Sequence, residues 1–262
     1  MSLLETIVLG IIQGATEFLP VSSSGHLVMG QALMDIRLPG VAFEVALHVA
    51  TLLSVLMVYR RRVGALVTGA LRGEGKAWKY VGLLALATIP AGVVGVAFGD
   101  FIEGLFDSPW VAGVALLVTG GFLWTSKMAV DKGPSAKPGA LAAVLVGLAQ
   151  AFAIIPGISR SGATVVAGLW LGIEAEEAAA FSFLMAIPAI LGAAVLEAPE
   201  LTEQGLGMSG AALLGGALAA AVVGVLAIRT FIAMLRQKAF HRFGPYCVGV
   251  GALFLLFLSL GG

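Results

Sequence analysis

The chain has 262 residues, of which 59% are hydrophobic and only 11% are charged, and its formal net charge is zero. Its mean hydropathy is +1.02. Because a soluble domain carries about 25% charged residues, this composition excludes a soluble protein and predicts an all-α integral membrane protein surrounded by membrane lipids. Zero net charge argues neither for nor against a partner, and nucleic acid is not expected as one. The single cysteine, Cys247, cannot form an internal disulfide.

The chain begins with two short apolar runs, 3–19 and 26–34, that are joined by a polar loop. A similar pair, 140–155 and 163–173, follows the middle of the chain. Irregular backbone at membrane depth is tolerated only where protein or a water-filled cavity covers it. We therefore expect each pair to form a re-entrant helical hairpin. A simple span over 3–19 is the alternative, but 26–34 is too short to cross back.

Between and after these pairs lie apolar segments long enough to span a membrane, which takes about 20 residues. There are six of them, at roughly residues 40–59, 79–99, 109–126, 177–196, 209–231 and 244–260. Together with the two hairpins they account for the whole chain as a single membrane domain, 1–262.

The two polar loops resemble each other. The first contains Gly10, Gln13, Glu17, Pro20, Ser22, Ser23, Ser24, Gly25 and His26, and the second contains Gly147, Gln150, Pro156, Ser159, Arg160, Ser161, Gly162 and Thr164. An offset of 137 residues superposes Gly10 on Gly147, Gln13 on Gln150 and Ser24 on Ser161. The pattern predicts two repeats, 1–130 and 138–262, each with one hairpin and three spans. An odd number of spans makes them inverted-topology repeats.

The distribution of basic residues predicts the orientation. Thirteen of the 15 lysines and arginines fall in the segments 60–79, 127–137 and 229–242, all on one face of this arrangement. The positive-inside rule assigns that face to the cytoplasm, so both termini face outward. The hairpins then enter from opposite sides, and their tips meet near the midplane. This arrangement brings Glu17, His26 and Arg160 together.

Arg160 and the hydroxyl groups around it predict an anion site. Arginine presents a planar fork of donors that matches phosphate oxygens, and a helix restarting after Ser161 and Gly162 would offer free N–H groups. The alternative is that Arg160 only pairs with Glu17. A structural ion pair does not explain the hydroxyl groups, which we expect to bind substrate, namely those of Ser22, Ser24, Ser159, Ser161 and Thr164.

The residues in and around the first loop predict a metal site and a general base. Gln13 and Glu17 are four residues apart, so their oxygens share one helix face and could hold a divalent cation if substrate oxygens complete its shell. Ser22, Ser23 or Ser24 could instead cap a helix. His26 could serve as a general base or activate a serine, although a lone histidine is usually structural. Glu44 and His48, one helical turn apart, either support the site from behind or pair only with each other, and Gln150 is expected behind the site.

The strings PVSSSGH (Pro20–His26) and PGISRSGAT (Pro156–Thr164) closely resemble the two signature motifs of the undecaprenyl-diphosphatase family, also called bacitracin-resistance proteins. The FEVALH segment (Phe43–His48) and the span pattern are also similar, so the resemblance covers the whole chain. It implies hydrolysis of the C55 cell-wall carrier diphosphate to the monophosphate and phosphate. It further implies a bacterial inner membrane, a site open to the outer face, and Mg²⁺ or Ca²⁺.

By this resemblance Gln13 and Glu17 fill the family's acidic motif, His26 is its catalytic histidine, and Arg160 is its phosphate clamp. Ser23 and Ser159 would be its functional hydroxyls. Gln13 is a permitted variant of glutamate at that position, but it removes a charge from the metal site. The nucleophile stays open between Ser23, His26 and water, and only the serine route predicts a phosphoenzyme.

Two other classes of membrane protein were weighed. A phosphatidic-acid-type phosphatase needs a second histidine about five residues after its arginine, where this chain has Val166. A secondary transporter or flippase of a phosphate-bearing lipid would share the inverted repeats, but it does not explain why one loop is acidic and the other basic. The expected partner is a prenyl diphosphate lipid, and a homodimer is compatible with the sequence.

Overall fold

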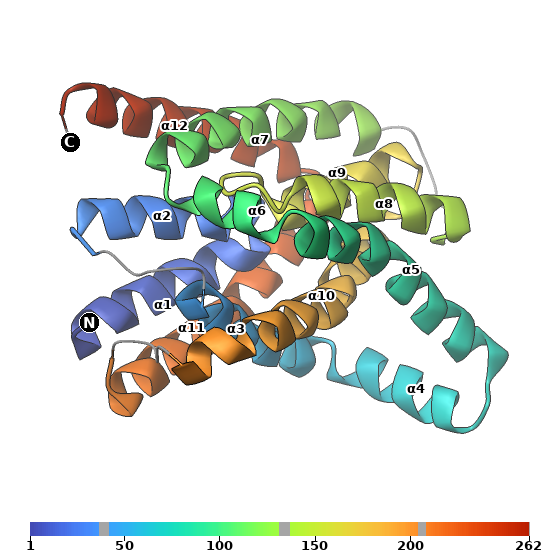
Figure 1. Ribbon diagram of the computed structural model, residues 1–262. Coiled ribbons are helices and arrows are strands. Elements are labelled where there is room, and N and C mark those ends of the chain that lie inside the picture. Colours follow the sequence, from blue (N-terminus) through green and yellow to red (C-terminus); the bar gives the residue numbers. More distant parts are fainter. Residues whose placement is uncertain (37–41, 131–136, 204–207, 262) are drawn as a thin grey trace.

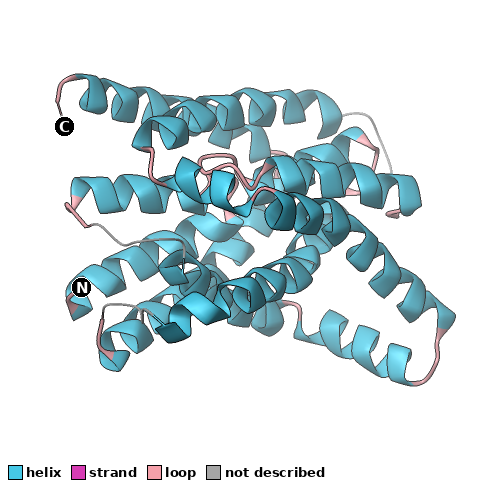
Figure 2. Cartoon of the chain, in the orientation of Figure 1, coloured by secondary structure: helices cyan, strands magenta, loops and turns pink. Residues whose placement is uncertain are grey.

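The computed structural model describes residues 1–36, 42–130, 137–203 and 208–261, and every regular element in these ranges is helical (Figure 2). The prediction of an all-α protein is confirmed. In chain order the elements are α1 (Leu3–Phe18), α2 (Ser23–Leu33), α3 (Ala42–Val58), α4 (Arg60–Leu71), α5 (Gly75–Ala97), α6 (Gly99–Phe106), α7 (Pro109–Val130), α8 (Ala140–Phe152), α9 (Arg160–Trp170), α10 (Ala175–Glu203), α11 (Gly210–Arg236), the 3-10 turn η1 (Phe240–Arg242) and α12 (Phe243–Ser259).

Five stretches of helix in the described ranges are long and apolar enough to cross a membrane, within α5, α7, α10 and α11 and over η1 with α12. Their exteriors are apolar too, since Val195 in α10 and Leu253 in α12 are each at least 70% exposed. Soluble proteins do not expose large apolar side chains on this scale. The chain is therefore a multi-pass membrane protein.

The region around Arg60 differs from the sequence prediction. The segment 60–79 was expected to be a loop after a span at 40–59, but Arg60–Leu71 forms its own helix, bent by 85° from α3. The bend falls where three consecutive arginines begin. Charged side chains are costly at membrane depth, so a straight continuation of α3 that kept these arginines in the membrane is disfavoured. If α3 and α4 are one broken span, the described ranges hold six candidate spans rather than five.

Two pairs of short helices, α1–α2 and α8–α9, form hairpins that enter the molecule from opposite ends of the view in Figure 1. Their tips touch at the centre. The Gly157 N–H donates to Ser24 Oγ at 3.4 Å, and Ser161 Oγ donates to the Leu19 carbonyl at 3.1 Å. Polar loops that lie far apart in the sequence are thus joined inside the protein.

Each hairpin packs against a long helix from the other half of the chain. In α1, a Cβ added to Gly10 would lie 2.2 Å from the Gly216 carbonyl oxygen of α11. In α8, a Cβ added to Gly147 would lie 2.5 Å from the Ala87 carbonyl oxygen of α5. Small residues allow such close backbone contact where no hydrophobic effect drives helices together. The glycines that the sequence superposes therefore make equivalent contacts, with the halves exchanged.

An aromatic cluster anchors the end of α1 beside the polar centre. Phe18 packs edge-on against Phe183, with ring centroids 5.4 Å apart, and Phe183 packs against Phe231 at 5.0 Å. Phe231 in turn meets Phe240 at 5.4 Å. Edge-to-face pairs of this kind fix ring orientation as well as burying area. The residue before Phe18, Glu17, is thereby held in place.

Candidate active site

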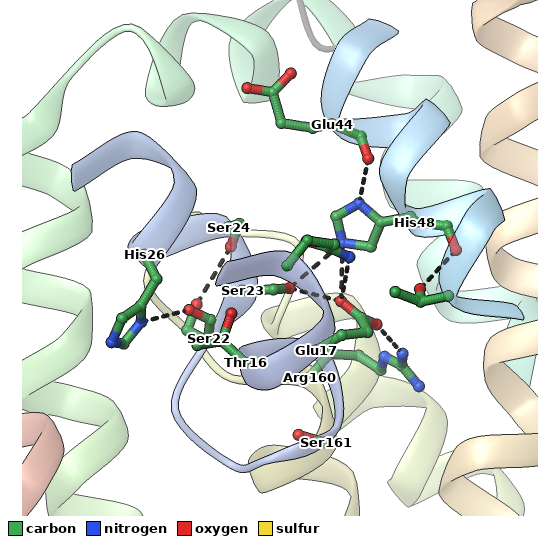
Figure 3. Close-up of polar contacts among 12 residues, drawn as sticks. Thr16, Glu17, Ser22, Ser23, Ser24, His26, Glu44, His48, Arg160 and Ser161 are labelled. Carbon is green, nitrogen blue, oxygen red and sulfur yellow. Dashed lines mark hydrogen bonds and ion pairs between the residues drawn. The ribbon is translucent and has the colours of Figure 1, made fainter. Parts of the chain in front are cut away.

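Glu17 lies at the centre of the polar contacts in Figure 3, and its side chain is almost fully buried. Its Oε1 accepts a hydrogen bond from Arg160 Nη2. Its Oε2 accepts from Ser23 Oγ at 2.6 Å and from Gln13 Nε2 at 3.2 Å, and lies 3.0 Å from His48 Nε2. Side chains from α1, α2, α3 and α9 therefore converge on one carboxylate.

The turn between α1 and α2 positions Ser23. Leu19 is extended, as is usual before proline, and this ends α1 at Phe18. Ser22 then adopts φ 69° and ψ 102° and caps α2 by accepting the Gly25 N–H on its Oγ at 3.2 Å. A non-glycine residue with positive φ costs about 1–3 kcal/mol and persists only where its surroundings hold it. The cap makes Ser23 the first residue of α2 and directs its hydroxyl toward Glu17.

Arg160 is the first residue of α9, three positions earlier than the sequence predicted. The helix starts there because Ser159 Oγ caps it by accepting the Gly162 N–H at 3.1 Å, so this N–H is not free for a ligand as expected. In the part of the chain that the structure describes, the Ser161 N–H makes no hydrogen bond. Arg160 Nη1 also donates to the Ser182 carbonyl of α10 at 3.3 Å, which orients the guanidinium.

These side chains line a cavity of about 230 Å³. Its polar residues are Glu17, Ser22, Ser23, Ser24, His48, Ser159 and Arg160, and its apolar residues are Val45, Phe106, Ala153, Ile154, Ile158, Ala189, Ile190 and Ala193. A polar floor with apolar walls suits a molecule with a charged head and a hydrocarbon tail. The prediction that the two loops share one site is supported by this cavity.

His48 lies at the same carboxylate as Arg160. Its Nδ1 lies 2.6 Å from the Glu44 carbonyl oxygen, and its Nε2 faces the Glu17 carboxylate at 3.0 Å. The imidazole ring is therefore held between the backbone of its own helix and Glu17. Arg160 and His48 flank one carboxylate, and both side chains offer donors to an anion in the cavity.

His26 does not meet Glu17 and Arg160 as the sequence predicted. Its Nδ1 lies 2.8 Å from the Ser22 carbonyl oxygen, its Nε2 lies 3.0 Å from the Tyr246 hydroxyl, and it is absent from the cavity lining. Figure 3 shows its ring on the far side of Ser22 from Glu17. A side chain four residues after Ser22 on the same helix reaches back to that carbonyl. His48 occupies the place expected for His26.

Other residues predicted for the site lie outside the cavity lining. Thr164 Oγ1 bonds to the Arg160 carbonyl at 2.7 Å and to Ser182 Oγ at 2.6 Å, within the protein. Glu44 Oε1 accepts from Gln31 Nε2 at 2.5 Å, and neither side-chain atom of Gln150 has a partner in the described ranges. Ser161 and Gly162 are occupied by the contacts given above. These residues support the loops and do not face the cavity.

Three supporting residues were missed by the sequence analysis. Thr119 Oγ1 in α7 accepts the Ser159 N–H at 3.1 Å and donates to the Gly157 carbonyl at 2.8 Å, so it braces the second loop. Ser182 and Tyr246 contact Arg160 and His26. Each is a polar residue within an apolar helix, and that position is the one signal that could have identified them.

A divalent cation would find a partial site at Gln13 and Glu17. Gln13 Oε1 is buried and has no partner among the described residues, and it lies on the same helix as the Glu17 carboxylate. No group of three or more histidines, cysteines, aspartates or glutamates in those ranges could hold a metal ion. Magnesium is often bound by one or two carboxylates together with substrate phosphates. Glu17 lines the cavity and Gln13 does not, so the residues fit a cation whose shell a ligand in the cavity completes on the Glu17 side.

Comparison with known protein families decides the family. The model of the bacitracin resistance protein BacA family matches residues 6–253. The chain belongs to the BacA family. The match includes both polar loops and every side chain that contacts Glu17.

Curated BacA-family relatives are similar over their full lengths. The undecaprenyl-diphosphatase of Alcanivorax borkumensis is 42% identical, covering 99% of this chain and 100% of the relative. That of Alkaliphilus metalliredigens is 41% identical with the same coverage, and that of Desulforapulum autotrophicum is 38% identical over 98% of both chains. The prediction of this family from the two loops is confirmed.

Proposed function

We propose that this BacA-family protein hydrolyses undecaprenyl diphosphate to undecaprenyl phosphate and inorganic phosphate, which recycles the lipid carrier of cell-wall synthesis. The observation that carries the proposal is the Ser23 hydroxyl, hydrogen-bonded to a buried carboxylate beside Arg160, in a cavity with a polar floor and apolar walls. The activity is the one named for the relatives given above. The diphosphate would lie on the floor and the prenyl chain along the walls.

Ser23 is the proposed nucleophile. Its Oγ attacks the terminal phosphorus while Glu17, already accepting its hydrogen bond at 2.6 Å, takes the hydroxyl proton. The bond from that phosphorus to the bridging oxygen breaks, and undecaprenyl phosphate leaves. Water then attacks the phosphoserine, inorganic phosphate is released, and the Ser23 oxygen regains a proton.

Arg160 and His48 would stabilise the transferred phosphoryl group. Charge spreads over its equatorial oxygens in the transition state, and preorganised donors at those oxygens contribute much of the rate. The guanidinium can turn from Glu17 to these oxygens, since the two groups lie in the same cavity.

Gln13 and Glu17 are the residues that would hold Mg²⁺ or Ca²⁺. When bound, such an ion supplies positive charge that neutralises the phosphate oxygens. Glu17 would then share its carboxylate between the ion and the Ser23 proton. Gln13 contributes an amide oxygen without a second negative charge.

The arrangement in the membrane belongs to the same proposal. We take α1–α2 and α8–α9 as re-entrant hairpins of two inverted repeats, 1–130 and 138–262, each with three spans. The exchanged packing of α1 on α11 and of α8 on α5 supports this interpretation, as does the entry of the hairpins from opposite ends of Figure 1. The positive-inside rule assigns the end with both termini to the outside of a bacterial inner membrane, and we take the site to open toward that face, as the family resemblance implies.

Phosphate release from a prenyl diphosphate by the purified protein in detergent tests the function. Release by the parent protein is measured with added Mg²⁺ or Ca²⁺ and with EDTA. The Arg160→Lys variant is measured under the same conditions. Its control is Arg61→Lys, because Arg61 lies in the exposed basic run. We expect metal-dependent release that falls about 100-fold or more in Arg160→Lys, the scale for removing one preorganised donor. No release from folded parent protein would contradict the proposal and direct attention to lipid transport in vesicles.

A further inference from the structure

His26 is satisfied on both ring nitrogens by groups outside the cavity. The Ser22 carbonyl can only accept a hydrogen bond, so His26 Nδ1 carries a hydrogen and donates it over 2.8 Å. Nε2 forms the second hydrogen bond of the ring, with the Tyr246 hydroxyl at 3.0 Å. The two rings are nearly parallel, with 3° between their planes. A histidine bonded in this way has no free nitrogen with which to accept a proton from a nucleophile.

Ser22 is the residue that needs this support. With φ 69° and ψ 102°, it lies outside the usual conformations of a residue with a side chain. Its carbonyl accepts both His26 Nδ1 and the His26 backbone N–H, the latter at 3.2 Å. The next residue is Ser23, whose Oγ makes the 2.6 Å bond to Glu17. A rotation of the Ser22 peptide would move Ser23 Oγ away from the Glu17 carboxylate.

The helix α12 holds this turn from behind through two neighbouring residues. Tyr246 acts through His26, and Cys247 Sγ contacts the Pro20 carbonyl oxygen at 3.6 Å. Neither residue lines the cavity. The last helix of the chain therefore fixes the shape of the first loop without touching a ligand.

We infer that Tyr246 and His26 are a positioning pair, which holds the strained Ser22 turn and so aims the Ser23 hydroxyl at the phosphorus. The inference rests on the proposed function, with Ser23 as nucleophile. It assigns His26 an orienting role in place of proton transfer. It also assigns a role to Tyr246, which lies outside the two loop motifs.

Asparagine at position 26 distinguishes the two roles. Its side-chain N–H₂ is attached to Cγ, as Nδ1 is in histidine, so it can donate to the Ser22 carbonyl, but it cannot take up a proton. We expect His26→Asn to keep kcat within about fivefold of the parent, the scale of one neutral hydrogen bond. His26→Ala should lower kcat by about 100-fold, the scale of a misplaced reacting group, with KM unchanged in both variants.

Tyr246→Phe removes only the hydroxyl and should lower kcat about fivefold, again without a change in KM. The matched control is Tyr59→Phe, since the Tyr59 hydroxyl makes no hydrogen bond in the described ranges. A purely structural role would lower the amount of folded protein and leave kcat per folded molecule unchanged, so each rate is divided by the monodisperse fraction.

The outcomes are distinct. If His26→Asn is as inactive as His26→Ala while both are folded, the histidine transfers protons and the inference is overturned. If Tyr246→Phe matches Tyr59→Phe in kcat, Tyr246 has no positioning role. If His26→Ala does not fold, the comparison of His26→Asn with the parent still decides. A parent protein that releases no phosphate refutes the proposed function instead.

Discussion

Glu17 has two roles that a single substitution would confuse. It is the buried partner of Arg160, and it is the acceptor for the Ser23 hydroxyl. Removing one partner of a buried ion pair leaves the other charge uncompensated, which costs about 3–5 kcal/mol, whereas replacing both by apolar or neutral groups is often nearly neutral. Stability and catalysis can therefore be separated by changing the two residues together.

We expect Glu17→Gln and Arg160→Met each to lower the melting temperature in detergent, because each removes one half of the buried Glu17–Arg160 pair. The double variant should regain part of the lost stability but none of the activity. Thermal unfolding and phosphate release, measured on all four proteins, complete the cycle. Recovered activity in the double variant would mean that the pair serves the fold alone.

A phosphoenzyme on Ser23 is the second expectation at this scale. With a substrate labelled on the terminal phosphate, acid quenching during turnover should leave label on the parent protein and none on Ser23→Ala. Ser259→Ala is the control, because Ser259 Oγ bonds only within its own helix, to the Leu256 carbonyl. Equal labelling of parent and Ser23→Ala would exclude Ser23 as nucleophile.

Among the elements, the second loop depends on Gly157 for its approach to α7. Gly157 has φ +96°, and a Cβ there would lie 2.4 Å from the Ala112 carbonyl oxygen. Gly172 has a similar φ of +74°, but no atom lies within 4 Å of its would-be Cβ. The two glycines therefore differ in crowding and not in backbone strain.

We expect Gly157→Ala to destabilise the protein by about 1–3 kcal/mol more than Gly172→Ala, since overpacking adds to the strain that both share. Activity should fall in Gly157→Ala alone, because the shifted loop carries Arg160. Melting temperature and phosphate release are measured on both variants. Similar losses would show that conformation and not close packing requires the glycine.

The helices of the hairpins could be predicted because proline and serine mark their ends in the sequence. The turn around Pro20 and a cap among Ser22, Ser23 and Ser24 follow from local chemistry and are visible in a sequence. The cap at Ser159 was missed, because the sequence analysis assigned that hydroxyl to the substrate and started the helix after Gly162. Which histidine, His26 or His48, lies beside Glu17 could not be predicted. That depends on how α3 packs beside α1, which no local pattern encodes. The bend at Arg60 was missed for a different reason, since three arginines also fit a loop.

For the molecule as a whole, the separation of basic segments from the chain ends predicts an orientation. Both ends lie at the left of Figure 1, while α4 and the start of α5 lie at the right. Cys247 is fully buried, so it does not compete for a thiol reagent. New cysteines can therefore be introduced one at a time in the native background.

We expect an impermeant maleimide to label Ser2→Cys in intact cells and Arg61→Cys only after permeabilisation. The reason is that Arg61 lies in the basic run that the positive-inside rule assigns to the cytoplasm. Labelling is read from a shift in electrophoretic mobility. The reverse pattern would invert the orientation and would turn the mouth of the cavity toward the cytoplasm.

The partnership between the two hairpins also has a consequence for biosynthesis. Arg160 follows Glu17 by 143 residues. Since a ribosome adds about 5–20 residues per second, the first hairpin exists for roughly 7 to 30 s before its arginine is made. Its packing helix α11 is completed later still. The nascent α1–α2 hairpin must therefore wait with a carboxylate that lacks its arginine, and a chain truncated before residue 160 would present that incomplete site to the quality-control proteases of the membrane.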